Sequence, residues 1–126
     1  MKSENEIMLD EWLQYAKDDL ESAKVILDKT DNYHVSVYHS HQAIEKLFKW
    51  FLLKSNRKFP FIHDIKELFR LVCEIKKQEN FLDGILFVDN LYPQLRYPTG
   101  DKISKADAEK SLETASEVFK ALGAVK

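Results

Sequence analysis

Glycine and proline are scarce in this chain of 126 residues, with three of each. Tight turns between β-strands draw heavily on these two residue types, and no stretch of the sequence alternates apolar and polar residues as a half-buried strand does. The sequence therefore argues against a sheet protein.

Cysteine is represented by Cys73 alone, so no disulfide can form within the chain. It lies next to Val72 and one helical turn after Phe69, which predicts a small buried side chain rather than a reactive thiol. The segment Met1–Glu6 carries two acidic residues against one basic one and is not followed by the apolar core of a signal peptide, and no apolar run approaches the roughly 18 residues that span a bilayer. We expect a cytoplasmic protein without a membrane span.

The chain also lacks a large excess of charge of either sign, because it has 21 acidic and 19 basic residues and a formal charge of −2. The total charge thus gives no reason to expect nonspecific wrapping of nucleic acid, although a local basic face remains possible. Hydrophobic residues make up 44% of the chain and include eight Phe and two Trp. That is enough for one packed core, so we expect a single domain over residues 1–126.

What the sequence does contain is apolar residues at helical spacing, in five segments. The first stripe runs from Leu9 to Leu27, and the second helix is placed at Tyr33–Lys54 with Asn32 as its cap. Short connections between such helices favour antiparallel neighbours. The predicted fold class is all-α, an up-and-down bundle of about five helices.

Prolines and capping signals place the later helices. A third helix is expected to start near His63, with Asp64 in its first turn and a buried apolar stripe from Ile65 to Ile75. The fourth should be kinked or broken at Pro93 and end by Pro98. Ser104, followed three residues later by Asp107, resembles a capping box for the last helix.

Polar residues concentrate between Tyr38 and Lys49, inside the second helix. His41 projects into the apolar arc of that helix and is expected to be a satisfied core histidine. Glu45 and Lys49 are expected to form an i,i+4 pair on a solvated face. Asp19, at the edge of the first stripe, should either meet a partner within the fold or be hydrated. These readings make Asp19, His41 and Glu45 structural polar residues.

Four blocks of residues then carry a family resemblance. They are Ala16, Asp19, Leu20 and Ala23; His41-Gln42-Ala43 with Glu45-Lys46 and Lys49; His63-Asp64 with Leu68; and Tyr92 with Arg96-Tyr97-Pro98. In this order and spacing the chain resembles the HEPN domain from about Leu9 to Leu122. The resemblance implies a helical bundle, often a homodimer, that works in many prokaryotes beside a minimal nucleotidyltransferase in a two-protein system of the toxin-antitoxin kind.

The resemblance also raises the alternative of a metal-independent ribonuclease. Such members of the wider superfamily carry an Arg-x(4-6)-His motif near a late helix, where the His moves a proton and the Arg neutralises phosphate charge. No His follows Arg96. A literal match runs instead from Arg57 to His63, in a loop interrupted by Pro60. In this alternative, Arg57 is the phosphate clamp and His63 the general acid or base.

Metal and cofactor binding are not expected. His39 and His41 point about 160° apart on a helix, so they cannot share one ion, and His63-Asp64 has no partner visible in the sequence. A glycine-rich phosphate loop and a Ser or Cys nucleophile signature are both absent.

The remaining candidates form a ligand-binding set: Lys46, Lys49, His63, Tyr92, Arg96 and Tyr97. Arg96 could hold a phosphate through its planar fork, while a Lys adds charge and a Tyr offers a stacking face. Alternatively, Arg96-Tyr97-Pro98 ends a helix and Arg96 pairs with Glu45 or Asp19. We expect a non-catalytic module that binds a nucleotide, a small nucleotidyltransferase partner, or both.

A homodimer is expected from the resemblance and from the second helix. Its apolar arc, from Trp50 through Phe51 and Phe48 to Leu52, covers about 200°, whereas a helix on one side of a core needs roughly 100°. Either helices of the same chain cover both flanks of this arc, or a second copy does. The resemblance favours the second copy, with His41 close to the interface.

Overall fold

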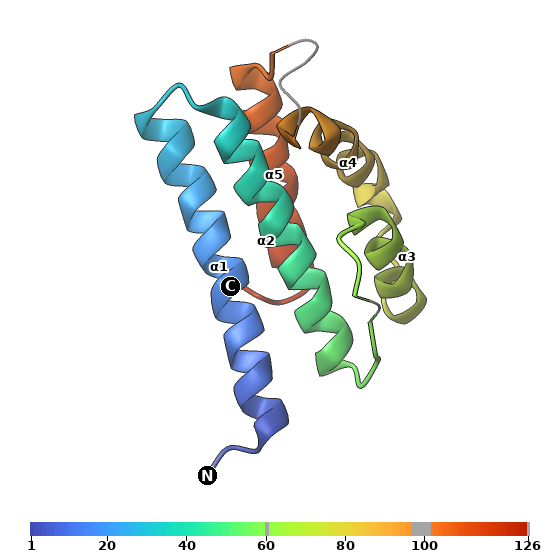
Figure 1. The fold of residues 1–126 in the computed structure, drawn as a ribbon. Helices are drawn as coiled ribbons and strands as arrows, with labels where there is room; N and C mark the ends of the chain where they lie inside the picture. Colours follow the sequence, from blue (N-terminus) through green and yellow to red (C-terminus); the bar gives the residue numbers. More distant parts are fainter. Residues whose placement is uncertain (60, 97–101, 126) are drawn as a thin grey trace.

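The computed structural model describes residues 1–59, 61–96 and 102–125, and these contain five α-helices, one 3₁₀ turn and no strand (Figure 1). The elements are α1 (Glu4–Lys29), α2 (Tyr33–Lys54), α3 (Ile65–Ile75), η1 (Glu79–Phe81), α4 (Leu82–Arg96) and α5 (Lys105–Ala121). The predicted all-α bundle is confirmed. No helix among the described residues is long and apolar enough to cross a membrane.

Local sequence signals account for where the helices begin. The side chain of Asp64 accepts hydrogen bonds from the backbone nitrogens of Lys66 and Glu67, so Asp64 is the N-cap of α3 rather than part of its first turn. The predicted capping box of Ser104 and Asp107 is present at α5, with both reciprocal bonds made. Asn32 precedes α2 without forming a side-chain cap.

Pro93 lies inside α4 and does not break it, because the helix continues to Arg96. At the other end of this helix, Gly84 allows close packing against α5. A Cβ atom at position 84 would lie only 2.8 Å from Oγ1 of Thr114. A larger residue there would push α4 and α5 apart.

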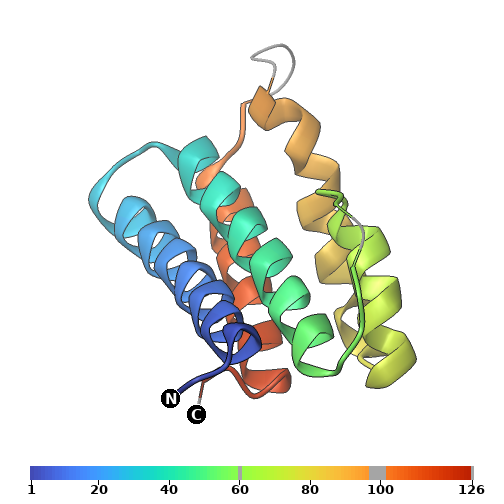
Figure 2. The ribbon, with the colours of Figure 1, turned by 60° about the horizontal axis from the view of Figure 1, so that its bottom comes forward.

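Helix α2 is the central element and packs against α1, α3, α4 and α5, as both ribbon views show (Figures 1 and 2). Its whole apolar arc is buried within the chain, including Trp50, Phe51, Phe48 and Leu52. The expectation that a second copy is needed to cover this arc is therefore wrong. Neighbouring helices of the same chain cover both flanks.

The connection between α2 and α3 crosses back along α2. His63, just before α3, contacts Glu45 in the middle of α2, whereas Arg57, just after α2, contacts Glu74 near the end of α3. Helices α2 and α3 therefore run in the same direction, so this pair departs from the antiparallel arrangement expected of neighbours. Between the two helices, Phe59 contacts Lys49 and His63 contacts Glu45, so the described residues of the connection pass along α2. We call residues 55–59 and 61–64 the return loop.

Two smaller expectations differ from the structure at the edge of the core. Cys73 is half-buried and packs against the main core without being enclosed by it. Ile75, the last residue of the predicted α3 stripe, is exposed because α3 ends there.

Candidate functional site

Six polar side chains of α2 form a band along the helix beside its apolar arc, and one of them, His41, lies within the edge of that arc. We call this the polar band; its members are His39, His41, Gln42, Glu45, Lys46 and Lys49. Each of them has a polar or aromatic contact with a neighbouring group. The band is bordered by α1 on one flank and by the return loop and α4 on the other.

On the α1 flank, Asp19 joins two members of the band. Its Oδ1 lies 2.8 Å from Nδ1 of His39, and its Oδ2 accepts a hydrogen bond from Nζ of Lys46 at 2.6 Å. The Asp19 side chain is only 12% exposed. Asp19 thus meets partners within the fold, and the ammonium of Lys46 is already paired with a carboxylate.

In the middle of the band, Glu45 and Lys49 form an ion pair with Nζ and Oε2 3.2 Å apart. Their side chains are 4% and 7% exposed, so the expectation of a solvated surface pair is wrong. The Lys49 ammonium lies 5.6 Å from the ring centre of Trp12 and 5.7 Å from that of Phe59. Aromatic rings from α1 and the return loop therefore replace water around this charge.

The return loop adds a second partner to Glu45. Nδ1 of His63 lies 3.0 Å from the same Oε2 atom that Lys49 contacts, while the His63 side chain remains 73% exposed. The structure therefore brings together residues from two of the sequence blocks, Glu45 and Lys49 from one and His63 from the next. The other carboxylate oxygen of Glu45, Oε1, is buried without a hydrogen-bond partner in the described part of the chain.

One turn before Glu45, His41 is buried with 1% of its surface exposed. Its ring stacks on Tyr92 of α4, with ring centres 4.1 Å apart and planes inclined by 30°. Its Nδ1 lies 3.3 Å from the amide oxygen of Gln42, but Nε2 has no partner among the described residues. His41 is therefore a core histidine, as predicted, but only half of its hydrogen-bonding capacity is satisfied.

Burial lowers the pKa of His41 from its ordinary value of 6.5, against the opposing effects of Gln42, Glu45 and Asp89. As pH falls below 6.5, the unfolded chain takes up a proton at His41 that the folded chain resists. We expect the free energy of unfolding to fall between pH 7.5 and pH 5.5, by up to about 1.4 kcal/mol per pH unit for this group.

Urea denaturation at both pH values would measure this effect. The loss should shrink in His41→Gln and persist in His34→Gln, because His34 is exposed. An unchanged pH dependence in His41→Gln would contradict this assignment.

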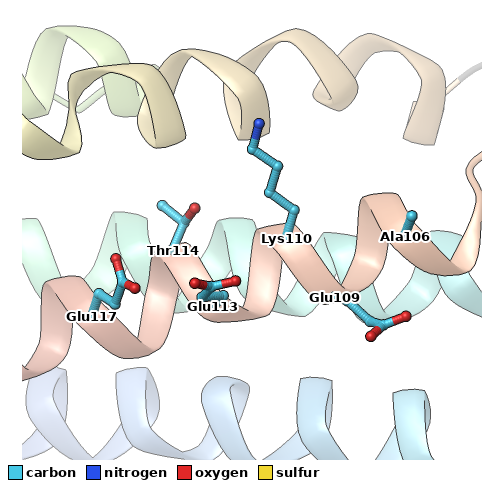
Figure 3. Close-up of a pocket in the computed structure, with 6 residues that line it drawn as sticks. All are labelled: Ala106, Glu109, Lys110, Glu113, Thr114 and Glu117. Atoms are coloured by element: carbon cyan, nitrogen blue, oxygen red, sulfur yellow. The ribbon is translucent and has the colours of Figure 1, made fainter.

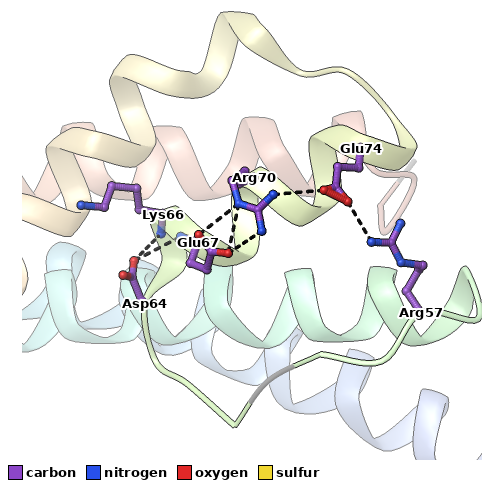
Figure 4. Close-up of polar contacts among 6 residues, drawn as sticks. All are labelled: Arg57, Asp64, Lys66, Glu67, Arg70 and Glu74. Atoms are coloured by element: carbon purple, nitrogen blue, oxygen red, sulfur yellow. Dashed lines mark hydrogen bonds and ion pairs between the residues drawn. The ribbon is translucent and has the colours of Figure 1, made fainter.

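The two residues of the ribonuclease alternative lie apart. Arg57 pairs with Glu74 at 2.9 Å near the end of α3, as Figure 4 shows. His63 directly precedes Asp64, the cap at the start of α3. Ten residues of helix separate Glu74 from Asp64, which corresponds to about 15 Å. One chain does not bring Arg57 and His63 onto the same phosphate.

The remaining predicted ligand residues lie near Tyr92. Arg96 is the last residue of α4, one turn after Tyr92, and its side chain lies outside what the structure describes. Tyr97 and Pro98 are likewise outside the described residues. Sequence reasoning missed the aromatic partners Trp12 and Phe59, because an apolar residue in a stripe or loop gives no sign that a lysine will lie against it.

Two further features of the described surface bear on metal binding and phosphate binding. No group of three or more His, Cys, Asp or Glu side chains in the described ranges is placed to hold a metal ion. A groove of about 440 Å³ follows α5, and its charged lining residues are three glutamates, Glu109, Glu113 and Glu117, and one lysine, Lys110 (Figure 3). Its carboxylates would repel a phosphate.

Comparisons with known proteins extend over almost the whole chain. Residues 9–125 match the model of the HEPN domain family. A protein of Methanocaldococcus jannaschii named "Putative toxin MJ1304" is 31% identical over an alignment 131 positions long, which includes 88% of this chain and 83% of that protein.

Solved structures share the fold. TT1696 from Thermus thermophilus aligns with a TM-score of 0.81 and 21% identity, over 91% of this chain and 95% of its own. ST0689, described as an archaeal HEPN homologue, aligns with a TM-score of 0.74 and 22% identity, over 98% and 97%. An HEPN domain protein from Thermotoga maritima gives a TM-score of 0.70 and 23% identity, over 90% and 94%.

Proposed function

The chain belongs to the HEPN domain family, and on that premise we propose that it is a non-catalytic module that binds a nucleotide at the polar band of α2. The observation that carries the proposal is the buried set of ionisable groups around Glu45. A buried ion pair gives little stability compared with apolar side chains of similar size, because both charges lose their hydration. Buried ionisable groups of this kind are typical of ligand-binding sites.

Within this proposal the residues have separate roles. Tyr92, stacked on His41, borders the site on the α4 side. Arg96 and Tyr97 follow it in the sequence, and we assign the phosphate to the planar fork of Arg96. Lys46 and Lys49 raise the positive potential of the band, although each is paired with a carboxylate in the free protein. His63 closes the site from the return loop.

Thermal unfolding in the presence of a nucleotide panel tests this function. A ligand at 100 times its dissociation constant adds about 2.7 kcal/mol to the free energy of unfolding, which raises the melting temperature measurably. We expect at least one nucleotide to raise it at millimolar concentration. If no nucleotide changes the melting temperature, the proposal is wrong.

We further propose that the protein acts in the cytoplasm, as a homodimer and beside a minimal nucleotidyltransferase. The family membership and the name of the M. jannaschii relative support this role in a toxin-antitoxin-like pair. Sedimentation of the purified protein would measure its oligomeric state. Co-purification with a nucleotidyltransferase encoded beside it would test the partner.

A metal-independent ribonuclease that uses Arg57 and His63 is the second candidate, and the toxin name of the same relative is what favours it. The distance along α3 means that two copies of the chain would have to supply Arg57 and His63 to one site. This activity predicts RNA cleavage in EDTA and its loss in His63→Ala. Intact RNA after incubation with folded protein would exclude it.

A further inference from the structure

Two unpartnered hydrogen-bond acceptors lie one turn apart on α2. Oε1 of Glu45 and Nε2 of His41 are both buried without a partner in the described part of the chain. Residues at i and i+4 are neighbours on a helix surface. An ionised carboxylate only accepts hydrogen bonds. Nδ1 of His41 lies 3.3 Å from the amide oxygen of Gln42, and in the tautomer that makes this contact a hydrogen bond Nδ1 carries the hydrogen and Nε2 presents a lone pair.

The charges around these atoms favour a donor over an anion. Lys49 already neutralises Glu45, and the carboxylate of Asp89 is close enough to favour the charged form of His41. Burial keeps His41 neutral at pH 7 all the same, so the imidazole adds no positive charge. What the two buried acceptors lack among the described residues is an N–H group to pair with. A phosphate brings only acceptors and would meet repulsion here.

His63 is the exposed group beside Glu45. Of the two side chains that bond to Glu45 in the described structure, Lys49 is buried and His63 is 73% exposed. Rotation of the exposed imidazole about its side-chain bonds would free Oε2 of Glu45 from His63 without moving a helix. His63 is therefore the group that a ligand would displace to reach Glu45.

We propose that the polar band selects nucleotides whose base carries an exocyclic amino group, with Oε1 of Glu45 and Nε2 of His41 each accepting one of its two hydrogens. This selectivity rests on the nucleotide-binding function proposed above. Adenine, cytosine and guanine carry such a group. Hypoxanthine and uracil place a carbonyl oxygen where adenine and cytosine carry the amino group, which leaves both buried acceptors without that donor and adds a third acceptor atom beside them.

Calorimetric titration with AMP and IMP tests the selectivity, because the two ligands share ribose and phosphate and differ in the amino group. We expect IMP to bind at least about tenfold more weakly than AMP, and UMP more weakly than CMP. Successive methylation of the AMP amino group should weaken binding in steps, since each methyl group removes one N–H donor. Equal affinities for AMP and IMP would overturn the selectivity and leave nucleotide binding intact. Absence of binding by every nucleotide would overturn the function itself.

Two variants test whether Glu45 is responsible for the preference for AMP over IMP. Glu45→Gln keeps the size of the side chain but offers an amide N–H to the carbonyl oxygen of IMP, so the preference for AMP should fall below about threefold. Glu113→Gln, a matched change at an exposed position on α5, should keep the full preference.

Circular dichroism establishes that both variants are folded. If Glu45→Gln does not fold, the methylated AMP series on the unmodified protein decides the question. A folded Glu45→Gln with an unchanged preference would overturn the assignment.

Discussion

Replacing Glu45 by leucine is expected to lower the free energy of unfolding by about 3–5 kcal/mol, because the change leaves the buried ammonium of Lys49 without a counter-charge. The nearby rings of Trp12 and Phe59 offset only part of this cost, since each cation–π contact contributes about 0.5–2 kcal/mol. Urea denaturation followed by circular dichroism measures the loss. A stability change below about 1 kcal/mol would show that Lys49 finds water in the folded protein.

The double variant Glu45→Leu with Lys49→Met is the control. It replaces both charged side chains by apolar side chains of similar size, so it should recover much of the stability that each single variant loses. Lys49→Met alone should be destabilising as well, because it leaves the Glu45 carboxylate buried with only His63 as a partner. If the double variant is as unstable as the sum of the single ones, the two side chains do not interact as an ion pair.

Replacing Phe48 by glutamate is expected to abolish folding. Phe48 has no exposed surface and packs against Phe69 of α3, with ring centres 5.8 Å apart. The loss of an aromatic core side chain costs about 3–5 kcal/mol, and an unpaired buried carboxylate costs several more, which together approach the whole stability of a typical domain. Circular dichroism should show the loss of helix.

Phe61→Glu is the matched control for this substitution, because Phe61 lies in the return loop with its side chain fully exposed. The same chemical change there should alter the free energy of unfolding by no more than about 0.5 kcal/mol. A folded monomer of the Phe48 variant would be the contrary result. It would mean that this face of α2 is covered by a second copy rather than by α3.

The helices and their ends could be predicted from the sequence because their causes are local. The helical spacing of apolar residues shows which segments form helices with one buried face. The bounds predicted for α2, Tyr33–Lys54, are those of the structure. The capping box at Ser104 needs only two side chains three residues apart. The continuation of α4 through Pro93 was missed, because a helix held by packing against its neighbours tolerates the hydrogen bond that proline removes.

The candidate site depended on contacts between residues far apart in the sequence. The sequence by itself singled out Glu45, Lys49 and His63 as unusual, but it placed the first two in solvent. Only the tertiary structure shows the return loop lying over them, with Phe59 beside Lys49 and His63 on Glu45. A loop's path is set by the packing of the elements at its two ends, not by the residues it will cover. The same path carries α3 parallel to α2 and separates Arg57 from His63 by the length of a helix.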